Sequence, residues 1–422
     1  MIKRRKTVKT DNEPIKVKGK IMKKKRLTAL ALSAVMVFSM AGCGSSDKKD
    51  SDKKKDSVKA ETLFDAIKLA PEYNHGTYSF SIDADLDIDE IKAEVIMEST
   101  GEVDGRNVAP DFAVTIKQGK ASAKVELEDA VTVTDDRLYL DFDRVIYLLS
   151  GVTTEFGSYG LLLPELDDDD ISGYNQKLFD AYADFIETLT DGIEIEGKDG
   201  EFTCTIEDRE DIKKVYANFV DYIKDEDNRD KVNDLINSAV TMVDYNAYAE
   251  ALYDDMSPDV ISAINAMKGD GYVTEADAEA FKEEMLAYVS EETEQIEEID
   301  IFKDSDIEGL VEQFDELTEE DWDELFEQFE TIKLDINVAA TEDSYKMDVV
   351  FLLEGQGHTA RFTVNYEFDV DEDVKVNAPD NASTLTEMAE YLMKDPNILE
   401  DIANGLENGP MGTLINTIKT TR

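Results

Sequence analysis

Apolar and polar residues alternate along residues 78–89, near the start of the patterned part of the chain. Between Tyr78 and Asp89, apolar side chains occupy the even positions, and serines and aspartates occupy the odd positions. A period of two places these two sets on opposite faces of a β-strand. The segment therefore predicts a strand with one buried face and one solvated face.

Similar alternation recurs in two groups of segments that a long helical region separates. Asp104-Gly105 and Gln118-Gly119 supply turn signals in the first group, and Gly355-Gln356-Gly357 supplies one in the second. Close hairpin spacing of this kind predicts antiparallel pairing, and the two groups could pair into one large curved sheet. The further strands that we expect cover residues 91–97, 112–116, 121–127, 138–142, 192–196, 201–206, 332–338, 345–353, 358–368 and 374–376.

Helical periodicity accounts for most of the remaining sequence. Apolar residues that recur every three or four positions, as at Tyr174, Leu178 and Tyr182, predict a helix with one buried face. Thr318 followed by Asp321 has the spacing of an N-cap with its reciprocal acid. The helices that we expect cover residues 61–69, 174–189, 212–223, 231–252, 258–267, 274–289, 307–317, 318–329 and a terminal segment from residue 385.

The order of strands, helices, strands and short helices predicts an α+β fold. We expect a curved antiparallel sheet, formed by two hairpin-rich β regions and packed with helices, with a central helical insertion. The expected organisation is a signal peptide at 1–42, a flexible tether at 43–59, a β-meander with helices at 60–207, an acidic helical subdomain at 208–330, and C-terminal hairpins and helices at 331–422.

Net charge narrows the range of partners. The full sequence has a formal charge of −53, and its first 42 residues hold 12 basic and two acidic residues, so a chain that begins at Cys43 carries −63. Such a surface repels nucleic acid and favours solubility and diffuse association with Ca²⁺. A hydrophobic content of 42% in periodic patterns favours a folded protein over a disordered one.

The N-terminal segment has the pattern of an export signal. Lys23-Lys24-Lys25-Arg26 precedes an apolar run from Leu27 to Met40, which is shorter than the about 20 residues that span a membrane. Met40-Ala41-Gly42-Cys43 then resembles the lipobox of bacterial lipoproteins. The other interpretation is an ordinary signal peptide that happens to contain a cysteine, and Met22 is an alternative initiator.

The lipoprotein resemblance implies a cellular location and a means of membrane attachment. It implies cleavage before Cys43, a diacylglyceryl group on that cysteine, and a lipid anchor on the extracytoplasmic face of the cell membrane; two acyl chains suffice for stable anchoring. The lysine- and aspartate-rich residues 44–59 predict a solvated tether. Cys204 alternates with Phe202 and Ile206, which favours a buried cysteine over a reactive thiol.

The architecture expected for the mature chain, together with its lipoprotein features, resembles the LolA/LppX-like half-barrel lipoproteins. In that family a curved antiparallel sheet packs over helices and shelters apolar ligands. The resemblance therefore implies a sheet that binds an apolar ligand. No sequence motif carries it, so no functional residue is transferred to this chain.

Residues that could support catalysis are scarce. His75 and His358 are the only histidines, and both fall at expected turns. Two histidines and two cysteines are too few for a zinc cluster of His and Cys, and no Walker A or convincing dinucleotide-binding motif occurs. Carboxylates are so abundant that the sequence singles out no acidic pair for glycoside hydrolysis. We expect no catalytic residue and no cofactor.

One segment between two expected helices resembles a degenerate EF-hand loop. Asp270, Thr274 and Asp277 would occupy loop positions five, nine and twelve, but Ala266 and Lys268 occupy positions one and three, where carboxylates are needed. These three residues are the candidate metal ligands. The other interpretation is an N-cap, with Thr274 capping a helix and Asp277 completing the box. The aspartate run 167–170 is a second cation candidate, which a solvated charge run also explains.

Two classes of function remain open. The first is a non-catalytic, membrane-anchored surface protein that binds an apolar ligand or a protein partner. The second is an extracellular hydrolase that uses carboxylates alone. The absence of a nucleophile next to a base favours the first class.

Overall fold

The structure, a computed structural model, describes residues 60–88, 91–119, 121–166, 168–269, 271–293, 300, 318–406, 409–413 and 416. The expected signal peptide, the tether, the lipidation site Cys43 and the expected helix at 307–317 lie outside the described residues. The described residues belong to one compact unit.

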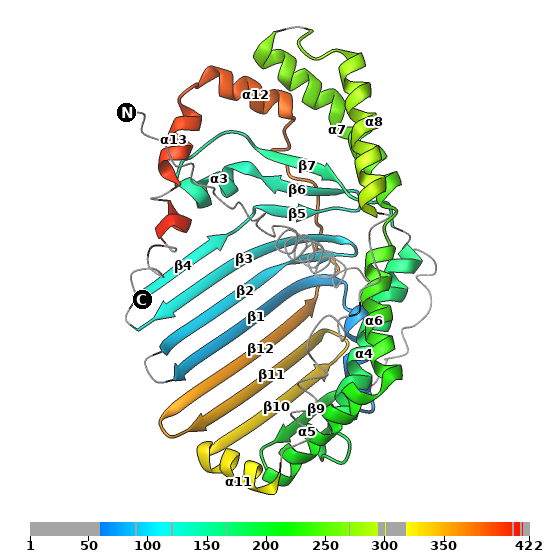
Figure 1. The fold of residues 1–422 in the computed structure, drawn as a ribbon, viewed down its shortest axis with the longest axis vertical. Helices are drawn as coiled ribbons and strands as arrows, with labels where there is room; N and C mark the ends of the chain where they lie inside the picture. Colours follow the sequence, from blue (N-terminus) through cyan, green and yellow to red (C-terminus); the bar gives the residue numbers. More distant parts are fainter. Residues whose placement is uncertain are drawn as a thin grey trace, which may run out of the picture. The chain divides into compact units, whose positions relative to one another are not determined.

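A curved, open, antiparallel sheet of twelve strands dominates this part of the chain (Figure 1). Its strand order is β7-β6-β5-β3-β2-β1-β12-β11-β10-β9-β8, and β4 pairs with β3 beside this path. The strands are β1 (His75–Ile88), β2 (Ile91–Asp104), β3 (Asn107–Gln118), β4 (Ala121–Leu127), β5 (Val131–Val133), β6 (Arg137–Asp141), β7 (Ser158–Leu162), β8 (Ile195–Lys198), β9 (Glu201–Ile206), β10 (Thr331–Ala340), β11 (Ser344–Gly355) and β12 (His358–Val370).

The two β regions of the sequence meet at one strand pair. β1 lies between β2 and β12, and its pairing with β12 runs from Gly76 opposite Val370 to Asp87 opposite Thr359. At the predicted turn between β11 and β12, Gln356 and Gly357 both have positive φ angles, as a two-residue type I′ hairpin requires. The prediction of an α+β fold with a curved antiparallel sheet is therefore confirmed.

The strand register gives the sheet an apolar face and a polar face. Residues directly opposite each other on neighbouring strands place their side chains on the same face. Ile82 is opposite Met97 and Val364, whereas the next residue, Asp83, is opposite Ile96 and Thr363. We call the face that carries Ile82 the apolar face and the face that carries Asp83 the polar face.

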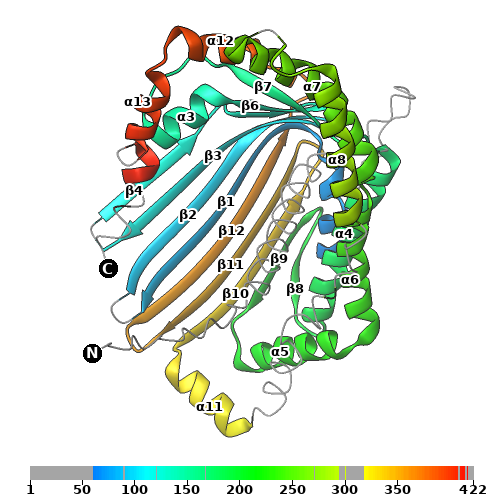
Figure 2. The same cartoon turned by 45° about the horizontal axis from the view of Figure 1, so that its top comes forward.

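Helices surround the sheet, and in both views α4 and α6 lie beside the ends of its central strands (Figures 1 and 2). The helices of the described residues are α2 (Leu63–Lys68), the 3-10 helix η1 (Ala70–Glu72), α3 (Phe142–Ser150), α4 (Asp168–Leu189), α5 (Arg209–Lys224), α6 (Glu226–Thr241), α7 (Tyr245–Lys268), α8 (Glu275–Thr293), α11 (Glu319–Gln328), α12 (Leu385–Lys394) and α13 (Ile398–Gly405). No helix among the described residues is long and apolar enough to cross a membrane.

The largest core lies where α2 and α4 pack on the apolar face. Leu63 and Ile67 of α2 and Ala183 of α4 are almost fully buried there. They share this core with Tyr345 of β11 and Phe368 of β12, which are each 1% exposed. Burial of such side chains contributes about 1.5–3 kcal/mol each, so this core contributes strongly to the stability of the fold.

Local predictions are wrong at three places. The single helix expected at 231–252 is interrupted, because α6 ends at Thr241 and α7 begins at Tyr245. The expected strand at 374–376 is a loop, although Val374 and Val376 are buried. β12 already lies between β1 and β11, so the chain that leaves it has no free strand edge beside it. The expected helix boundary at Pro258 is also absent, because α7 continues through this proline. Packing of α7 against α12 outweighs the lost backbone hydrogen bond.

The helices of 208–330 attach to the rest of the unit at several places. α5 and α6 pack against α4, and α7 packs against α12 and β7. At α11 the expected N-cap is present, since the Asp321 carboxylate accepts hydrogen bonds from the backbone amide and hydroxyl of Thr318. Trp322 of α11 packs edge-on against Tyr216 of α5, with 5.1 Å between the ring centroids.

Candidate apolar binding face

Large hydrophobic side chains are exposed together on the apolar face. They are Leu86 of β1, Met97 of β2, Phe112 of β3, Phe351 of β11 and Phe362 of β12, each between 39% and 44% exposed. Single exposed hydrophobic residues are common, but several on one face of adjacent strands mark a candidate binding surface. We call the part of the apolar face that these five residues define the open patch.

The open patch exists because the helices cover only one end of the apolar face. Near that end, Tyr345 and Phe368 lie opposite each other and are buried beneath α2 and α4. Toward the Gln356–Gly357 turn, Phe351 and Phe362 lie opposite each other on the same two strands and are exposed. One alternating pattern therefore supplies both a core and an apolar surface.

The dimensions of the open patch follow from strand geometry. From Phe80 to Leu86 the apolar face extends six residues along β1, which is about 20 Å. From β3 to β11 it crosses four strand spacings, or about 19 Å. The product is roughly 400 Å², within the size range at which exposed apolar patches are often functional.

No charged side chain interrupts the apolar face of the five central strands within the described residues. On β1, β2, β3, β11 and β12, every position that the register assigns to this face is apolar or uncharged and polar, apart from His358 beside the turn. Asp and Glu occupy the other face of the same strands. The open patch can therefore accept hydrocarbon without burying an unpaired charge.

Tyrosines mark the boundary between the covered end and the open patch. Tyr345 and Tyr366 lie with their ring centroids 6.0 Å apart, and Tyr73 lies 5.3 Å from Tyr345. On β1, the Tyr78 hydroxyl lies 3.0 Å from the Ser99 hydroxyl of β2. We call Tyr78, Tyr345 and Tyr366 the tyrosine cluster, because the register places all three on the apolar face.

Burial determines the electrostatics of these phenols. Removal from water raises the pKa of Tyr345, Tyr366 and Tyr78, and it raises the pKa of Tyr73 to about 12. All four therefore stay neutral at physiological pH and can donate a hydrogen bond. The Tyr73 hydroxyl donates to the Thr341 carbonyl at 2.6 Å, whereas no described group accepts a hydrogen bond from the buried Tyr345 hydroxyl.

The polar face contains ion pairs and one carboxylate, that of Asp83, in an electrostatically unfavourable environment. Lys117 of β3 donates to Glu94 of β2 at 2.8 Å, and the pKa of Lys117 is raised by this hydrogen bond. Burial, followed by the charges of Glu94 and Asp85, raises the pKa of Asp83. One Asp83 oxygen is out of solvent without a described hydrogen-bond partner. We interpret this as a local electrostatic cost within a charged surface.

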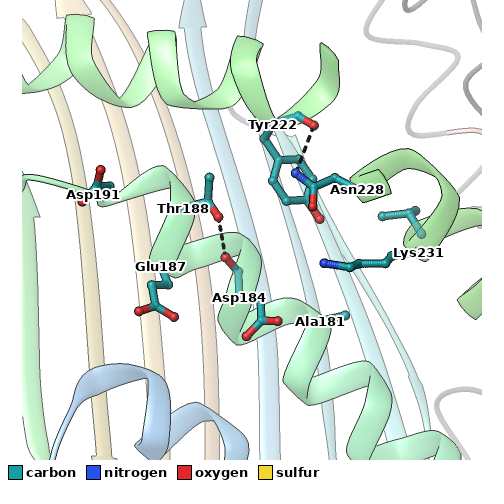
Figure 3. Close-up of a pocket in the computed structure, with 9 residues that line it drawn as sticks. Ala181, Asp184, Glu187, Thr188, Asp191, Tyr222, Asn228 and Lys231 are labelled. Atoms are coloured by element: carbon teal, nitrogen blue, oxygen red, sulfur yellow. Dashed lines mark hydrogen bonds between the residues drawn. The ribbon is translucent and has the colours of Figure 1, made fainter. Parts of the chain in front are cut away.

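A polar groove of about 540 Å³ lies between α4, α5 and α6 (Figure 3). One residue of the groove lining, Asp184, forms an ion pair with Lys68 of α2, with 3.1 Å between Oδ1 and Nζ. This pair neutralises part of the Asp184 charge. No group of three His, Cys, Asp or Glu residues in the described part of the chain has the arrangement to hold a metal ion. The groove is lined by Ala181, Asp184, Glu187, Thr188, Asp191, Tyr222, Asn228, Lys231 and Val232.

The candidate metal ligands are described only in part. Asp270 lies outside the described residues, as does Asp167 of the aspartate run. Thr274 and Asp277 contact each other: the Asp277 carboxylate accepts from the Thr274 amide at 3.0 Å and from its hydroxyl at 2.7 Å. These hydrogen bonds, which lower the pKa of Asp277, form the N-cap box of α8. The metal site at this loop stays a prediction.

The residues considered for catalysis lie apart from one another. His75 Nε2 lies 3.1 Å from Oδ1 of Asp104, and Lys375 Nζ lies 3.3 Å from the same oxygen. His358 lies at the other end of the sheet, beside the β11–β12 turn. Cys204 is fully buried on the apolar face, as expected, and burial raises the pKa of its thiol. The structure brings none of these residues together.

Sequence reasoning missed the tyrosine cluster and the open patch. Each tyrosine lies at an apolar position of its strand and reads as an ordinary core residue in the sequence. A usable signal did exist, because these long strands have more apolar positions than helices packed at one end of the sheet can cover. Only the register shows that the three tyrosines share one region of the face.

No protein-family model, curated protein or solved structure matches this chain.

Proposed function

We propose that this protein is a lipid-anchored, extracytoplasmic binding protein that holds the hydrocarbon chain of a lipid on the open patch. The observation that carries the proposal is the joint exposure of Leu86, Met97, Phe112, Phe351 and Phe362 on one uncharged face. The export signal and the lipobox pattern that ends at Cys43 support the address. The function is binding, without catalysis.

Hydrocarbon suits the open patch better than a protein partner does. A protein interface carries backbone and side-chain polar groups that need hydrogen-bonding partners. The open patch offers apolar side chains and few donors or acceptors, and its charges lie on the opposite face of the sheet. A lipid chain has no polar groups along its length, so it loses no hydrogen bonds on this surface.

The test is binding of a lipid to the processed chain, made with Cys43→Ala so that it carries no acyl chains of its own. We expect a fluorescent long-chain lipid to bind with saturation, and Phe362→Asp to weaken binding at least tenfold. A buried unpaired carboxylate beside the hydrocarbon costs more than the about 1.4 kcal/mol that a factor of ten requires. Arg361→Asp, on the polar face one residue earlier, is the matched control.

Absence of saturable lipid binding by the folded protein would contradict the proposal. A protein that binds the open patch in a Phe362-dependent way, with no lipid binding, would assign the surface to a protein partner instead.

A further inference from the structure

Helix α8 is attached to the fold chiefly through α7. The two helices lie side by side in both views (Figures 1 and 2). Lys282 of α8 donates to Asp254 of α7 at 2.6 Å and lies 3.6 Å from Glu250. None of the 19 residues of α8 is buried. Because most helices owe their stability to burial of one face against the rest of the fold, the side of α8 that faces away from α7 is a surface without cover.

This uncovered side carries exposed aromatic rings. Phe281 and Tyr288 are 61% and 58% exposed, and their spacing of seven residues places them on one face of the helix. Tyr272, in the turn that precedes α8, is 66% exposed. Aromatic residues are enriched at protein interfaces, where they bury a large apolar area. Several exposed rings on one face of a weakly packed helix therefore indicate a docking surface.

Carboxylates alternate with the rings along the same face. Glu284 lies three residues after Phe281 and four before Tyr288, and Glu291 follows Tyr288 by three. Both glutamates are exposed, and neither has an ion-pair or hydrogen-bond partner in the described part of the chain. The helix has seven acidic residues and one basic residue, Lys282, which pairs with α7. We call the surface formed by Phe281, Glu284, Tyr288 and Glu291 the outer face of α8.

The charge of the outer face limits what can cover it. A symmetric dimer would place this face against its own copy and bring Glu284 and Glu291 close to like charges. An anionic membrane surface would be repelled for the same reason. Lysine or arginine side chains would instead pair with the carboxylates and lie over the rings of Phe281 and Tyr288. Both features of the face therefore favour a basic partner with apolar side chains.

We propose that the outer face of α8 docks a positively charged segment of another protein, in which lysines or arginines alternate with apolar residues at helical spacing. The apolar residues of this segment cover Phe281 and Tyr288, and its cations pair with Glu284 and Glu291. This mode places one amphipathic helix along another. The outer face shares no residue with the open patch, so the inference is independent of the proposed lipid binding.

The experiment titrates the processed Cys43→Ala protein into a fluorescent synthetic peptide, a helix of about five turns with leucine on one face and lysine on the other. We expect saturable binding by fluorescence anisotropy. Phe281→Ala combined with Tyr288→Ala should weaken it about tenfold, because buried rings dominate such interfaces. Tyr147→Ala, which removes a 54% exposed ring from α3, is the matched control and should bind like the parent.

A second pair of variants tests the charge. Glu284→Gln should weaken peptide binding about threefold and make it less sensitive to sodium chloride, since one screened attraction is lost. Glu187→Gln removes an exposed carboxylate from α4 and should change neither property. Thermal melts control for folding, and the melting temperatures should change little because the replaced side chains are exposed.

Absence of saturable binding would overturn the proposal. Equal affinity for a peptide of the same composition in shuffled order, or unchanged affinity of the double alanine variant, would also overturn it, because the acidic chain would then attract lysines without a defined site. Phe281-dependent self-association would assign the outer face to a second copy, and Phe281-dependent sedimentation with phosphatidylcholine vesicles would assign it to a membrane. None of these measurements depends on lipid binding at the open patch.

Discussion

Arg137 of β6 and Asp255 of α7 form a two-point ion pair across 118 residues of sequence. The Nη1–Oδ2 and Nη2–Oδ1 distances are 3.1 and 2.6 Å, and Arg137 Nη1 also donates to the Gly160 carbonyl of β7 at 3.1 Å. Both side chains are less than a third exposed. The hydrogen bond to Asp255 raises the pKa of Arg137. This ion pair attaches α7 to strands β6 and β7, at one edge of the sheet.

We therefore predict that Asp255→Asn lowers the free energy of unfolding by about 2 kcal/mol, since it leaves a partly buried guanidinium with a weaker partner. The matched control is Glu126→Gln, which breaks the Lys124–Glu126 pair at the same 2.6 Å distance but with both side chains about half exposed. That change should cost far less, because solvent screens an exposed pair. Urea denaturation measures the free energy of unfolding of both variants. Equal losses would contradict the prediction that the partly buried Arg137–Asp255 pair stabilises the fold more than an exposed pair does.

Asp83 should make stability depend on pH in a defined direction. Burial raises the pKa of Asp83 in the folded protein above 3.8, the ordinary value of a free aspartate, so the folded state holds this proton more tightly than the unfolded state does. The resulting stabilisation is complete below that value and is lost as the pH rises through the folded-state pKa. At pH 7 the ionised Asp83 therefore destabilises the fold.

Asp83→Asn should consequently stabilise the protein at pH 7 by about 0.5 kcal/mol. The gain should shrink to nothing as the pH falls below the unfolded-state value, because the parent is then also neutral at this position. Glu354→Gln removes a charge at an exposed position of β11 that does not act on Asp83, and it serves as the control. A gain that is constant from pH 3 to pH 7 would mean that the amide acts through new hydrogen bonds and that charge is not the cause.

The proposed membrane anchoring is tested at the expected lipidation site. We predict that Cys43→Ala abolishes metabolic labelling with palmitate and moves the protein from the membrane fraction to the soluble fraction or the medium. Two acyl chains are enough for stable anchoring, so their loss should release the protein. Cys204→Ala is the control, because Cys204 is buried in the core and cannot carry a lipid without unfolding. Unchanged labelling of the Cys43 variant would disprove the assignment.

Calcium should stabilise the protein diffusely. The carboxylates of a chain with a formal net charge of −53 repel one another. Salt should therefore raise the melting temperature, and Ca²⁺ should raise it more than Na⁺ at matched ionic strength, since a divalent ion bridges neighbouring carboxylates. Because Asp277 caps α8 in the structure, we expect this increment to survive Asp270→Ala. A saturable increment that disappears in that variant would instead establish the loop as a calcium site.

The sequence by itself determined the elements and the chemistry of their faces. Alternation at residues 78–89 predicts a strand with one acidic and one apolar face, and both faces are present in β1. Glycine at position 357 and the capping pair Thr318 and Asp321 act through local backbone geometry and local hydrogen bonds, so short-range patterns suffice to predict them.

Only the tertiary structure decided what happens to the apolar face. The pairing of β1 with β12 joins residues almost 300 positions apart, and nothing local specifies it. Phe351 and Phe368 have the same pattern in the sequence, yet α2 and α4 bury Phe368 and leave Phe351 exposed. Burial depends on which helices reach a given end of the sheet, which is a property of the assembled chain. The open patch and the tyrosine cluster at its border therefore became visible only in three dimensions.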